Sequence, residues 1–329
     1  MTHDPCWEVV IAHAMDRSSP PLKTTVIYHS ADFDGIFCRE IARKFLGDEN
    51  VTYIGWNHGD KPVELPSEGT IYVMDLPVDR VFGFDFGDPE TIPPAFSASG
   101  DLPDIIWIDH HKTAIETHPP GIPGYRISGV AACRLAWQWF AACEEHMQDT
   151  RFLGYPQKQD FIARKVIEPL AVRLAGEYDI WDKRDPDAEV FQFGLKSVEV
   201  GDAQWPLLLD TREQFTRDVV HAGFPTKRYQ RAQDKERMAR SFEVQWAGLT
   251  FLTYNGRGNS LTFLSAIKPQ HDALLLCHWD GRKWMVSLYH APGKEHHDLS
   301  EIAKRNGGGG HGGACGFVCE KLPFLASGE

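Results

Sequence analysis

Residues 104–111 read DIIWIDHH, and this stretch decides the fold that we expect. Its apolar part is rich in β-branched and aromatic side chains, as are three earlier runs at residues 25–28 (TVIY), 51–56 (VTYIGW) and 70–74 (TIYVM). Short runs that are apolar on both faces are typical of parallel strands buried between helices. The sequence therefore predicts an α/β fold whose N-terminal domain is a parallel sheet with flanking helices.

Polar side chains follow these runs at their carboxyl ends. His29, Asp75 and Asp109 each follow one run, and His110 and His111 come directly after Asp109. Open α/β sheets bind ligands in the crevice beyond the carboxyl ends of their strands, so we expect these residues to converge there. One imidazole of the pair can then bind a metal while its neighbour points toward a substrate. Taken singly, Asp75 is also explained as a surface strand end and the histidine pair as incidental.

Residues 29–35, HSADFDG, add two more carboxylates to this edge. Asp32 and Asp34 are two apart in an expected strand-to-loop segment, so they are predicted to point the same way, with His29 on the same side. One imidazole and two carboxylates suit manganese, zinc or iron better than calcium. Gly35 lets the backbone turn into a helix. The alternative is an ordinary turn whose aspartates cap that helix.

A last acidic candidate lies in residues 175–182, AGEYDIWD, after an expected helix. Either Asp179 or Asp182 can supply a carboxylate to the same site, and the sequence does not choose between them. The alternative is an acidic turn packed around Trp181.

A glycine-rich segment stands near the C-terminus at residues 306–317, NGGGGHGGACGF. Small residues such as Gly308, Gly309 and Gly310 let backbone N–H groups approach an anion, and His311 can donate to a phosphate. This segment is therefore the candidate substrate-binding site. The alternative is a flexible linker.

Between these motifs the sequence predicts mostly helices. Two are expected over residues 130–147 and 158–175, and an irregular segment with three prolines is expected over 185–226. Residues 227–243 then form a charged helix, for which a solvated connector and an anion-binding role both stay open.

The C-terminal part returns to a β pattern. Asp280 and Gly281 mark a hairpin turn, and a helix over 298–306 is expected to be capped by Asp298 or Ser300. The expected strands are residues 249–255, 261–267, 272–281 and 282–290.

Four parts of the chain are expected from this pattern. They are an N-terminal arm at 1–23, the parallel-sheet domain at 24–185, a connector at 186–243 and a smaller α/β domain at 244–329.

Composition limits the possible partners and the location. The formal net charge of −12 argues against binding to duplex DNA, which depends on many Lys and Arg contacts with phosphate. The sequence has neither a run of about 18 apolar residues nor a secretory signal pattern, so a cytoplasmic protein without a membrane partner is expected. Seven scattered cysteines are expected to be reduced thiols, and a zinc site is not expected among them.

The ordered motifs resemble those of the DHH phosphoesterase family, which is named for a strand-end Asp-His-His like residues 109–111. The resemblance spans residues 24–320 and includes a C-terminal segment that is similar to the DHH-associated domain around His311. Within the family, the layout looks closest to the nano-RNase and dinucleotide phosphodiesterase branch. One departure is that Tyr289 and His290 stand where an arginine often precedes the glycine segment.

The resemblance implies two metal ions, with Mn²⁺ expected and Mg²⁺ or Co²⁺ as possible substitutes. Asp109 would orient a neighbouring histidine, and His111 would contact the reacting phosphate. The implied metal ligands are His29 and Asp32 for one ion, Asp34, His110 and Asp179 for the other, and Asp75 as a bridge between them.

The same resemblance implies a hydrolase that acts on short single-stranded oligonucleotides, or on cyclic or linear dinucleotides, and releases mononucleotides. An in-line attack of hydroxide on phosphorus is the expected reaction. Two alternatives stay open: a phosphatase of pyrophosphate or nucleotide bisphosphates, and a non-catalytic nucleotide sensor. A homodimer is compatible with the sequence, which does not determine the oligomeric state.

Overall fold

The structure is a computed structural model that describes residues 23–88, 90–93, 104–148, 154–182, 184–198 and 200–324. Contacts divide the chain into two compact units, one ending at Phe224 and the other beginning at Pro225. The predicted N-terminal arm, apart from Lys23, lies outside the described residues, as does Cys6. The six cysteines within the described part of the chain are all free thiols.

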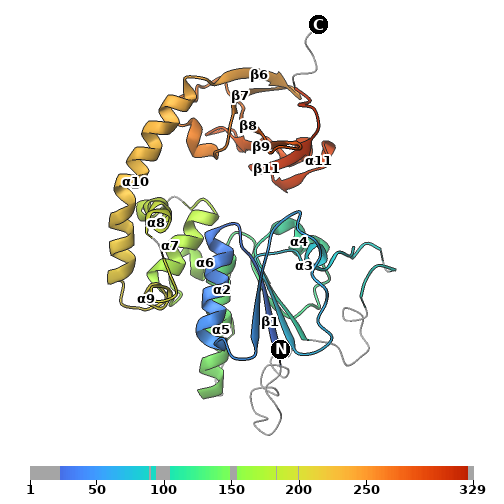
Figure 1. Ribbon diagram of the computed structural model, residues 1–329, viewed down its shortest axis with the longest axis vertical. Coiled ribbons are helices and arrows are strands. Elements are labelled where there is room, and N and C mark those ends of the chain that lie inside the picture. The colour runs from blue at the N-terminus through green and yellow to red at the C-terminus, as the bar shows by residue number, and fades with distance from the viewer. Residues whose placement is uncertain are drawn as a thin grey trace. The chain divides into compact units, whose positions relative to one another are not determined.

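A five-stranded sheet forms the centre of the first unit (Figure 1), and every pair of its neighbouring strands is parallel. The parallel sheet predicted from the apolar runs is therefore confirmed. Its strands, in spatial order, are β2 (Val51–Trp56), β1 (Thr24–His29), β3 (Thr70–Met74), β4 (Asp104–Asp109) and β5 (Gly124–Arg126).

Helices cover both faces of this sheet because its strands alternate between two apolar clusters. Val26 and Ile106 pack toward α2 (Phe33–Leu46) and α5 (Ala132–Gln148). Ile27 and Trp107 pack on the opposite face, toward α3 (Val78–Phe82) and α4 (Lys112–Thr117). The first unit is thus a three-layer α/β structure, as runs that are apolar on both faces require.

The prediction of a single helix over residues 158–175 is wrong. Two helices are present, α6 (Lys158–Ile162) and α7 (Leu170–Asp179). Arg164 has a φ of 52°, which ends the first helix, and Pro169 precedes the second in an extended conformation. Proline fits the start of a helix, where its missing N–H leaves no bond unmade.

The prediction that residues 185–226 are irregular is also wrong, because most of this segment is helical. Pro186 and Pro206 lie in the first turns of their helices, where proline is well tolerated, so they start helices instead of excluding them. The helices are α8 (Pro186–Ser197), α9 (Trp205–Leu208) and α10 (Gln214–Met238). Residues of α8 and α9 belong to the main core of the first unit, whereas the sequence placed a connector at 186–243.

The second unit is built on a mixed six-stranded sheet. All its strand pairs are antiparallel except β7 with β8. In spatial order the strands are β10 (Gly309–His311), β11 (Ala314–Cys319), β9 (Trp284–His290), β8 (Ala273–Trp279), β7 (Leu249–Asn255) and β6 (Phe242–Trp246). Helix α11 (Ser300–Arg305) packs on one face, and Met238 and Phe263 pack on the other.

Local hydrogen bonds explain where the second unit follows the prediction and where it does not. The prediction of a strand over residues 261–267 is wrong. This segment begins in a 3-10 helix, η2 (Ser260–Phe263), because the Asn259 side chain accepts a hydrogen bond from the backbone N–H of Leu261. The hairpin at Asp280 is confirmed, and its carboxylate accepts from the backbone N–H groups of Arg282 and Lys283. At α11, Asp298 accepts from the backbone N–H of Ser300, although the helix N-cap position itself is Leu299.

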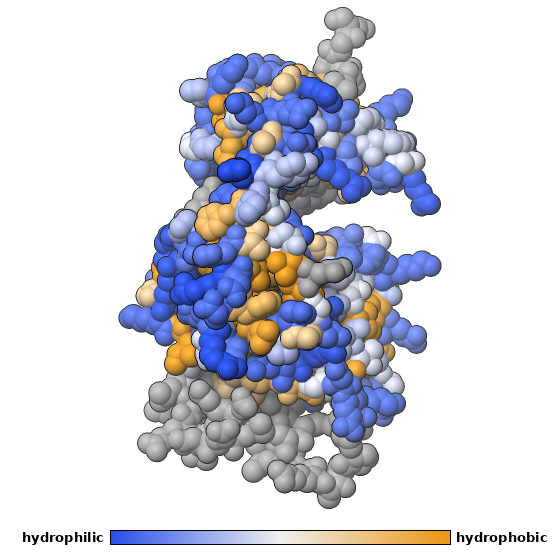
Figure 2. Space-filling model, turned by 60° about the vertical axis from the view of Figure 1, so that its left-hand side comes forward, coloured by the Kyte–Doolittle hydropathy of each residue, from blue (hydrophilic) through white to orange (hydrophobic). Residues whose placement is uncertain are grey.

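The face in Figure 2 is mostly hydrophilic, with hydrophobic side chains gathered over part of it. Exposed large apolar side chains include Leu207, Phe224 and Tyr229. Among the described helices, none is both long and apolar enough to cross a membrane.

Candidate metal centre

Three neighbouring parallel strands bring their terminal polar residues to one edge of the sheet. His29 ends β1, Asp75 follows β3, and Asp109 ends β4, with β3 lying between the other two. The structure therefore brings together the strand-end residues that the sequence selected, as the Cα register of the parallel pairs requires.

Eight side chains at this edge form overlapping groups of possible metal ligands. In each group, the candidate ligand atoms lie within 4.8 Å of one another. One group is His29, Asp32 and Asp75, another is Asp34, His110 and Asp179, and a third is Asp75, Asp109, His110 and His111.

Asp75 belongs to the first group and also reaches His110 of the second. Its Oδ2 atom is 3.4 Å from His29 Nδ1, and its Oδ1 atom is 3.3 Å from His110 Nε2. Of the two acidic alternatives after α7, Asp179 lies 3.4 Å from His110 Nε2, whereas Asp182 pairs with Arg184. The geometry therefore selects Asp179 as the acidic neighbour of His110.

The backbone at Asp75 has an unusual conformation. Its φ of 59° lies in the left-handed region, which costs a residue with a side chain about 1–2 kcal/mol. Its N–H donates to the carbonyl of Ile108 at 2.9 Å, which holds the residue against β4. Strain of this kind is concentrated at functional sites, and here it accompanies the carboxylate that faces both histidines.

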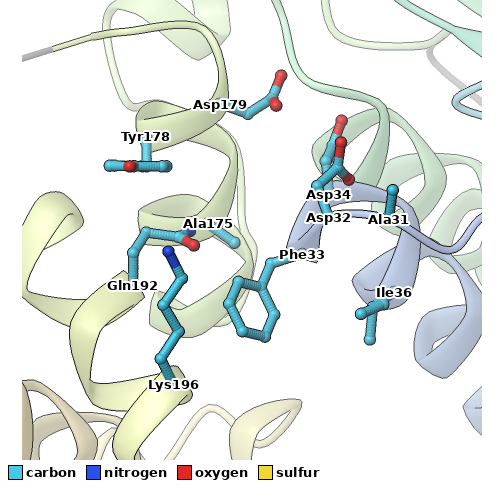
Figure 3. Close-up of a pocket in the computed structure, with 10 residues that line it drawn as sticks. All are labelled: Ala31, Asp32, Phe33, Asp34, Ile36, Ala175, Tyr178, Asp179, Gln192 and Lys196. Carbon is cyan, nitrogen blue, oxygen red and sulfur yellow. The ribbon is translucent and has the colours of Figure 1, made fainter. Parts of the chain in front are cut away.

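Asp32 and Asp34 lie side by side at the start of α2 and line the same cavity (Figure 3), but their carboxylates have different partners. Asp32 is the N-cap, accepts from the N–H of Gly35 and lies 3.0 Å from His29 Nδ1. The capping alternative is thus correct for Asp32, and its carboxylate borders the first group at the same time.

Asp34 is buried and faces the start of α5. Its two carboxylate oxygens accept from the backbone N–H groups of Ala132 at 2.9 Å and Cys133 at 2.8 Å. The Oδ2 atom also lies 3.6 Å from His110 Nε2. A helix N-terminus favours a negative charge, so α5 helps to keep this carboxylate in place.

The carboxylate of Asp109 orients the His111 ring. The carboxylate is fully buried, and its Oδ1 atom accepts from the backbone N–H groups of His110 at 2.7 Å and His111 at 3.2 Å. The same oxygen lies 2.7 Å from His111 Nδ1. This contact orients the His111 ring and leaves its Nε2 atom on the side away from Asp109.

The charges at this edge strongly affect one another. Burial by itself lowers the pKa of His29 and His110, but the neighbouring carboxylates raise both to about 10. Burial and the charge of Asp75 raise the pKa of Asp34 to about 6. Burial likewise raises the pKa of Asp179 well above its ordinary value, with the charge of Asp34 adding to it. A site with this many carboxylates is stabilised by added positive charge.

The residues fit a pair of divalent cations. His29 Nδ1 and Asp75 Oδ1 are buried and make no well-oriented hydrogen bond within the described residues, although oppositely charged atoms lie 3.0 Å and 3.3 Å from them. The donor set is imidazole nitrogen and carboxylate oxygen without thiolate, which suits manganese and related ions. His29, Asp32, Asp34, Asp75, His110 and Asp179 are the residues that would hold them.

His58 is a site neighbour that the sequence analysis missed. Its ring centroid lies 5.7 Å from that of His29, and its pKa is lowered by burial and by the charges of His29 and His111. His58 comes two residues after the end of β2, so the rule that selected the other strand-end residues also points to it.

A cavity of about 190 Å³ opens beside the second metal-ligand group (Figure 3). The sequence analysis missed it because two of its walls come from α7 and α8, in segments whose helices were wrongly predicted. Its lining residues are Ala31, Asp32, Phe33, Asp34, Ile36, Ala175, Tyr178, Asp179, Gln192 and Lys196.

The glycine-rich segment forms a β-hairpin of β10 and β11, so the flexible-linker alternative is wrong. Some of its glycines are needed for packing. A Cβ atom at Gly308 would lie 2.0 Å from the carbonyl oxygen of Gly316, and one at Gly310 would lie 2.7 Å from Cys315 Cα. A Cβ atom at Gly309 meets nothing within 4 Å, and His311 is exposed. Substrate binding by this segment stays a prediction.

Together, the parallel sheet and its strand-end residues define an α/β fold with a candidate metal centre at the carboxyl edge of the sheet. No protein-family model matches the sequence, and no curated protein matches it.

Solved structures do match the fold. An exopolyphosphatase-related protein from Bacteroides fragilis has a TM-score of 0.53 at 13% sequence identity, with coverage of 96% of this chain and 92% of that protein. Exonuclease RecJ bound to manganese has a TM-score of 0.49 at 11% identity, with coverage of 98% and 91%. A pGpG-specific phosphodiesterase from Vibrio cholerae has a TM-score of 0.42 at 15% identity, with coverage of 91% and 93%. The first of these supports, for the fold, the resemblance that the motifs predicted.

Proposed function

We propose that this chain is a metal-dependent phosphoester hydrolase. One observation carries the proposal: the two carboxylate oxygens of Asp75 face two different histidines, His29 and His110, and each histidine belongs to a separate group of possible ligands. A carboxylate shared in this way is what a pair of adjacent metal ions needs, and paired ions are common in enzymes that cleave phosphate esters.

Two divalent cations bound here would polarise the phosphate oxygens and lower the pKa of a water molecule. The protein's own groups would then orient the substrate. His111, whose Nδ1 atom is fixed by Asp109, can donate from Nε2 to a non-bridging phosphate oxygen. Asp34 is held by the N-terminus of α5, so the ligand group that contains His110 has a rigid support.

The proposed substrate is a short oligonucleotide or a dinucleotide, which is released as mononucleotides. The ordered motifs that resemble the nano-RNase branch support this substrate, as does the cavity that shares Asp34 and Asp179 with the metal-ligand group. The net charge of −12 favours a small substrate held by bound cations over a long duplex held by basic residues. Among possible ions, Mn²⁺ is proposed because its preferred donors match this set.

The test compares substrates with the purified full chain in Mn²⁺, Mg²⁺ or Co²⁺. The panel is linear dinucleotides, longer oligomers, cyclic dinucleotides, a nucleoside bisphosphate and pyrophosphate, ranked by kcat/KM. We expect cleavage to depend on Mn²⁺ and kcat/KM to be highest for linear dinucleotides. Asp179→Asn serves as the variant without activity and Asp182→Asn as its matched control, since Asp182 pairs with Arg184 outside the ligand groups.

Two outcomes would assign a different function. Selective cleavage of pyrophosphate or of the bisphosphate would identify a phosphatase of small phosphoanhydrides or phosphomonoesters. Metal-dependent nucleotide binding without turnover of any substrate would identify a nucleotide sensor.

A further inference from the structure

We propose that the cavity between α2, α7 and α8 is a nucleobase pocket that selects bases with a keto oxygen beside a ring N–H, such as guanine and uracil, over adenine and cytosine. This inference rests on the proposed function, since it concerns the substrate of the same metal centre. It adds a recognition site for the base, formed by the first unit alone.

The cavity is close enough to the metal-ligand group to serve the same substrate. Asp34 and Asp179 line the cavity and also belong to the group with His110. In Figure 3 these carboxylates lie at one end, while Gln192 and Lys196 lie across from Phe33 at the other end. A nucleotide whose phosphate is held at the metal centre would therefore have its base within reach of the cavity.

The walls favour a flat heterocycle over a second phosphate. Phe33, Ile36 and Ala175 supply apolar surface, and the Phe33 ring offers a face for stacking. Lys196 is the only cationic side chain among the lining residues, and a phosphate bound there would lack the several donors that such sites usually supply. The volume of about 190 Å³ is below the roughly 300–1,000 Å³ of pockets that hold a whole drug-sized ligand, so it suits one part of a nucleotide.

Gln192 and Lys196 give the cavity its polar side. The Gln192 side chain is 4% exposed, and its amide makes no hydrogen bond with the described residues although it points into the cavity. Lys196 is exposed, its Nζ atom lies 5.8 Å from the centroid of the Phe193 ring, and it forms no ion pair within the described part of the chain. Its ammonium faces the same space (Figure 3). An amide that makes no hydrogen bond with the described residues is available to bond with a ligand in the cavity.

The donor pattern of this pair determines which bases fit. An ammonium group only donates, whereas an amide both donates and accepts. A keto oxygen beside a ring N–H, as in guanine and uracil, can accept from Lys196 while Gln192 accepts from the N–H. In the same orientation, adenine and cytosine place an amino group where that oxygen would lie, and an amino group cannot accept from the ammonium.

The test measures base preference as the ratio of kcat/KM between dinucleotides of guanine or uracil and those of adenine or cytosine. Overall damage to the protein would lower both values and leave this ratio unchanged. Guanine, uracil, adenine and cytosine dinucleotides and an abasic dinucleotide are compared in Mn²⁺. The variants are Lys196→Met and Lys196→Arg, with Gln192→Leu as a second probe of the pocket. Lys44→Met is the matched control, since Lys44 is an exposed lysine of α2 that does not line the cavity.

We expect the wild-type protein and Lys44→Met to prefer keto bases by about tenfold in kcat/KM, the value of one good polar contact. Lys196→Met and Gln192→Leu should reduce this ratio toward one, and Lys196→Arg should retain it. The proposal is overturned if Lys196→Met keeps the wild-type ratio, or if it lowers kcat/KM equally for abasic and base-containing dinucleotides.

Failure of the proposed function gives a different result. In that case, the wild-type protein would cleave none of the dinucleotides, including the abasic one. Binding of guanosine and adenosine monophosphate to the Mn²⁺-loaded protein would then decide the inference. Tighter binding of the guanine nucleotide that is lost in Lys196→Met supports the pocket, and equal affinities overturn it.

Discussion

The carboxylate of Asp34 accepts a 2.8 Å hydrogen bond from the backbone N–H of Cys133, which lies 99 residues later in the chain. The second carboxylate oxygen accepts from the neighbouring Ala132 in the same way. The aspartate that faces His110 therefore also closes the N-terminus of α5, so the candidate metal centre and the helical layer share one side chain. This shared role leads to the first prediction.

Asp34→Asn and Asp34→Ala should both abolish Mn²⁺-dependent hydrolysis, but they should differ in stability. Both substitutions remove the charge, so the repulsion from Asp75 is lost equally in the two variants. Asn can still accept from one α5 amide, whereas Ala leaves both amides without this acceptor. We expect Asp34→Ala to have a free energy of unfolding about 1–2 kcal/mol lower than Asp34→Asn, measured by urea denaturation in a chelator. Equal free energies of unfolding would show that these two hydrogen bonds do not contribute to stability.

Mn²⁺ should stabilise the wild-type protein but not Asp179→Asn. At a free concentration of 100 times the Kd, a bound ion adds about 2.7 kcal/mol to the free energy of unfolding. Without metal, Asp179→Asn should be at least as stable as wild type at pH 8. The folded-state pKa of Asp179 is raised, so its ionised form opposes folding above the ordinary pKa of about 4. Asp182→Asn is the control and should keep the Mn²⁺ effect.

Binding of Mn²⁺ should release protons at neutral pH. Carboxylates hold the pKa of His29 and His110 at about 10 in the metal-free protein, so both rings carry a proton at pH 7. An imidazole must be neutral to bind a metal ion. The affinity for Mn²⁺ should therefore increase from pH 6 to pH 9. Titration calorimetry in two buffers with different ionisation enthalpies measures the release, and heats that do not depend on the buffer would contradict it.

Asp109→Asn should lower kcat by about 100-fold while the protein stays folded. The Asn oxygen can still accept from the backbone N–H groups of His110 and His111, so the buried local structure is preserved. The contact that orients the His111 ring changes, because a neutral amide cannot stabilise the imidazole as a carboxylate does. Adding His111→Ala to Asp109→Asn should cause little further loss in steady-state kinetics. Full additivity of the two losses would show that Asp109 acts independently of His111.

Gly308→Ala and Gly309→Ala separate a structural role of the glycine segment from a binding role. A Cβ atom at position 308 would overlap the carbonyl oxygen of Gly316, so Gly308→Ala should destabilise the second unit. The Cβ atom at 309 meets no other atom within 4 Å, so Gly309→Ala should leave the thermal unfolding temperature within about 2 °C of wild type. If the segment approaches the substrate, Gly309→Ala raises KM without lowering stability. An unchanged KM in both Gly309→Ala and His311→Ala would assign the segment to structure alone.

Local patterns in the sequence determined the parallel sheet and most residues of the candidate site. Strands such as 104–109 could be predicted because an apolar run on both faces is a local property, and the position of Asp109 at its end follows directly. The fold then brings the ends of β1, β3 and β4 together, since parallel strands share one carboxyl edge. His58 follows β2 at the same edge of the sheet, so the same rule also points to it.

Only the tertiary structure decided how these residues are divided into groups and what lies beside them. Asp32 and Asp34 contact different histidines because α2 begins at Phe33, so Asp32 caps the helix beside His29 while Asp34, inside its first turn, reaches α5 and His110. Asp179 and not Asp182 joins His110 because α7 ends at that residue. The cavity depends on the packing of α2 against α7 and α8, and long-range packing of this kind is not encoded in any single stretch of sequence.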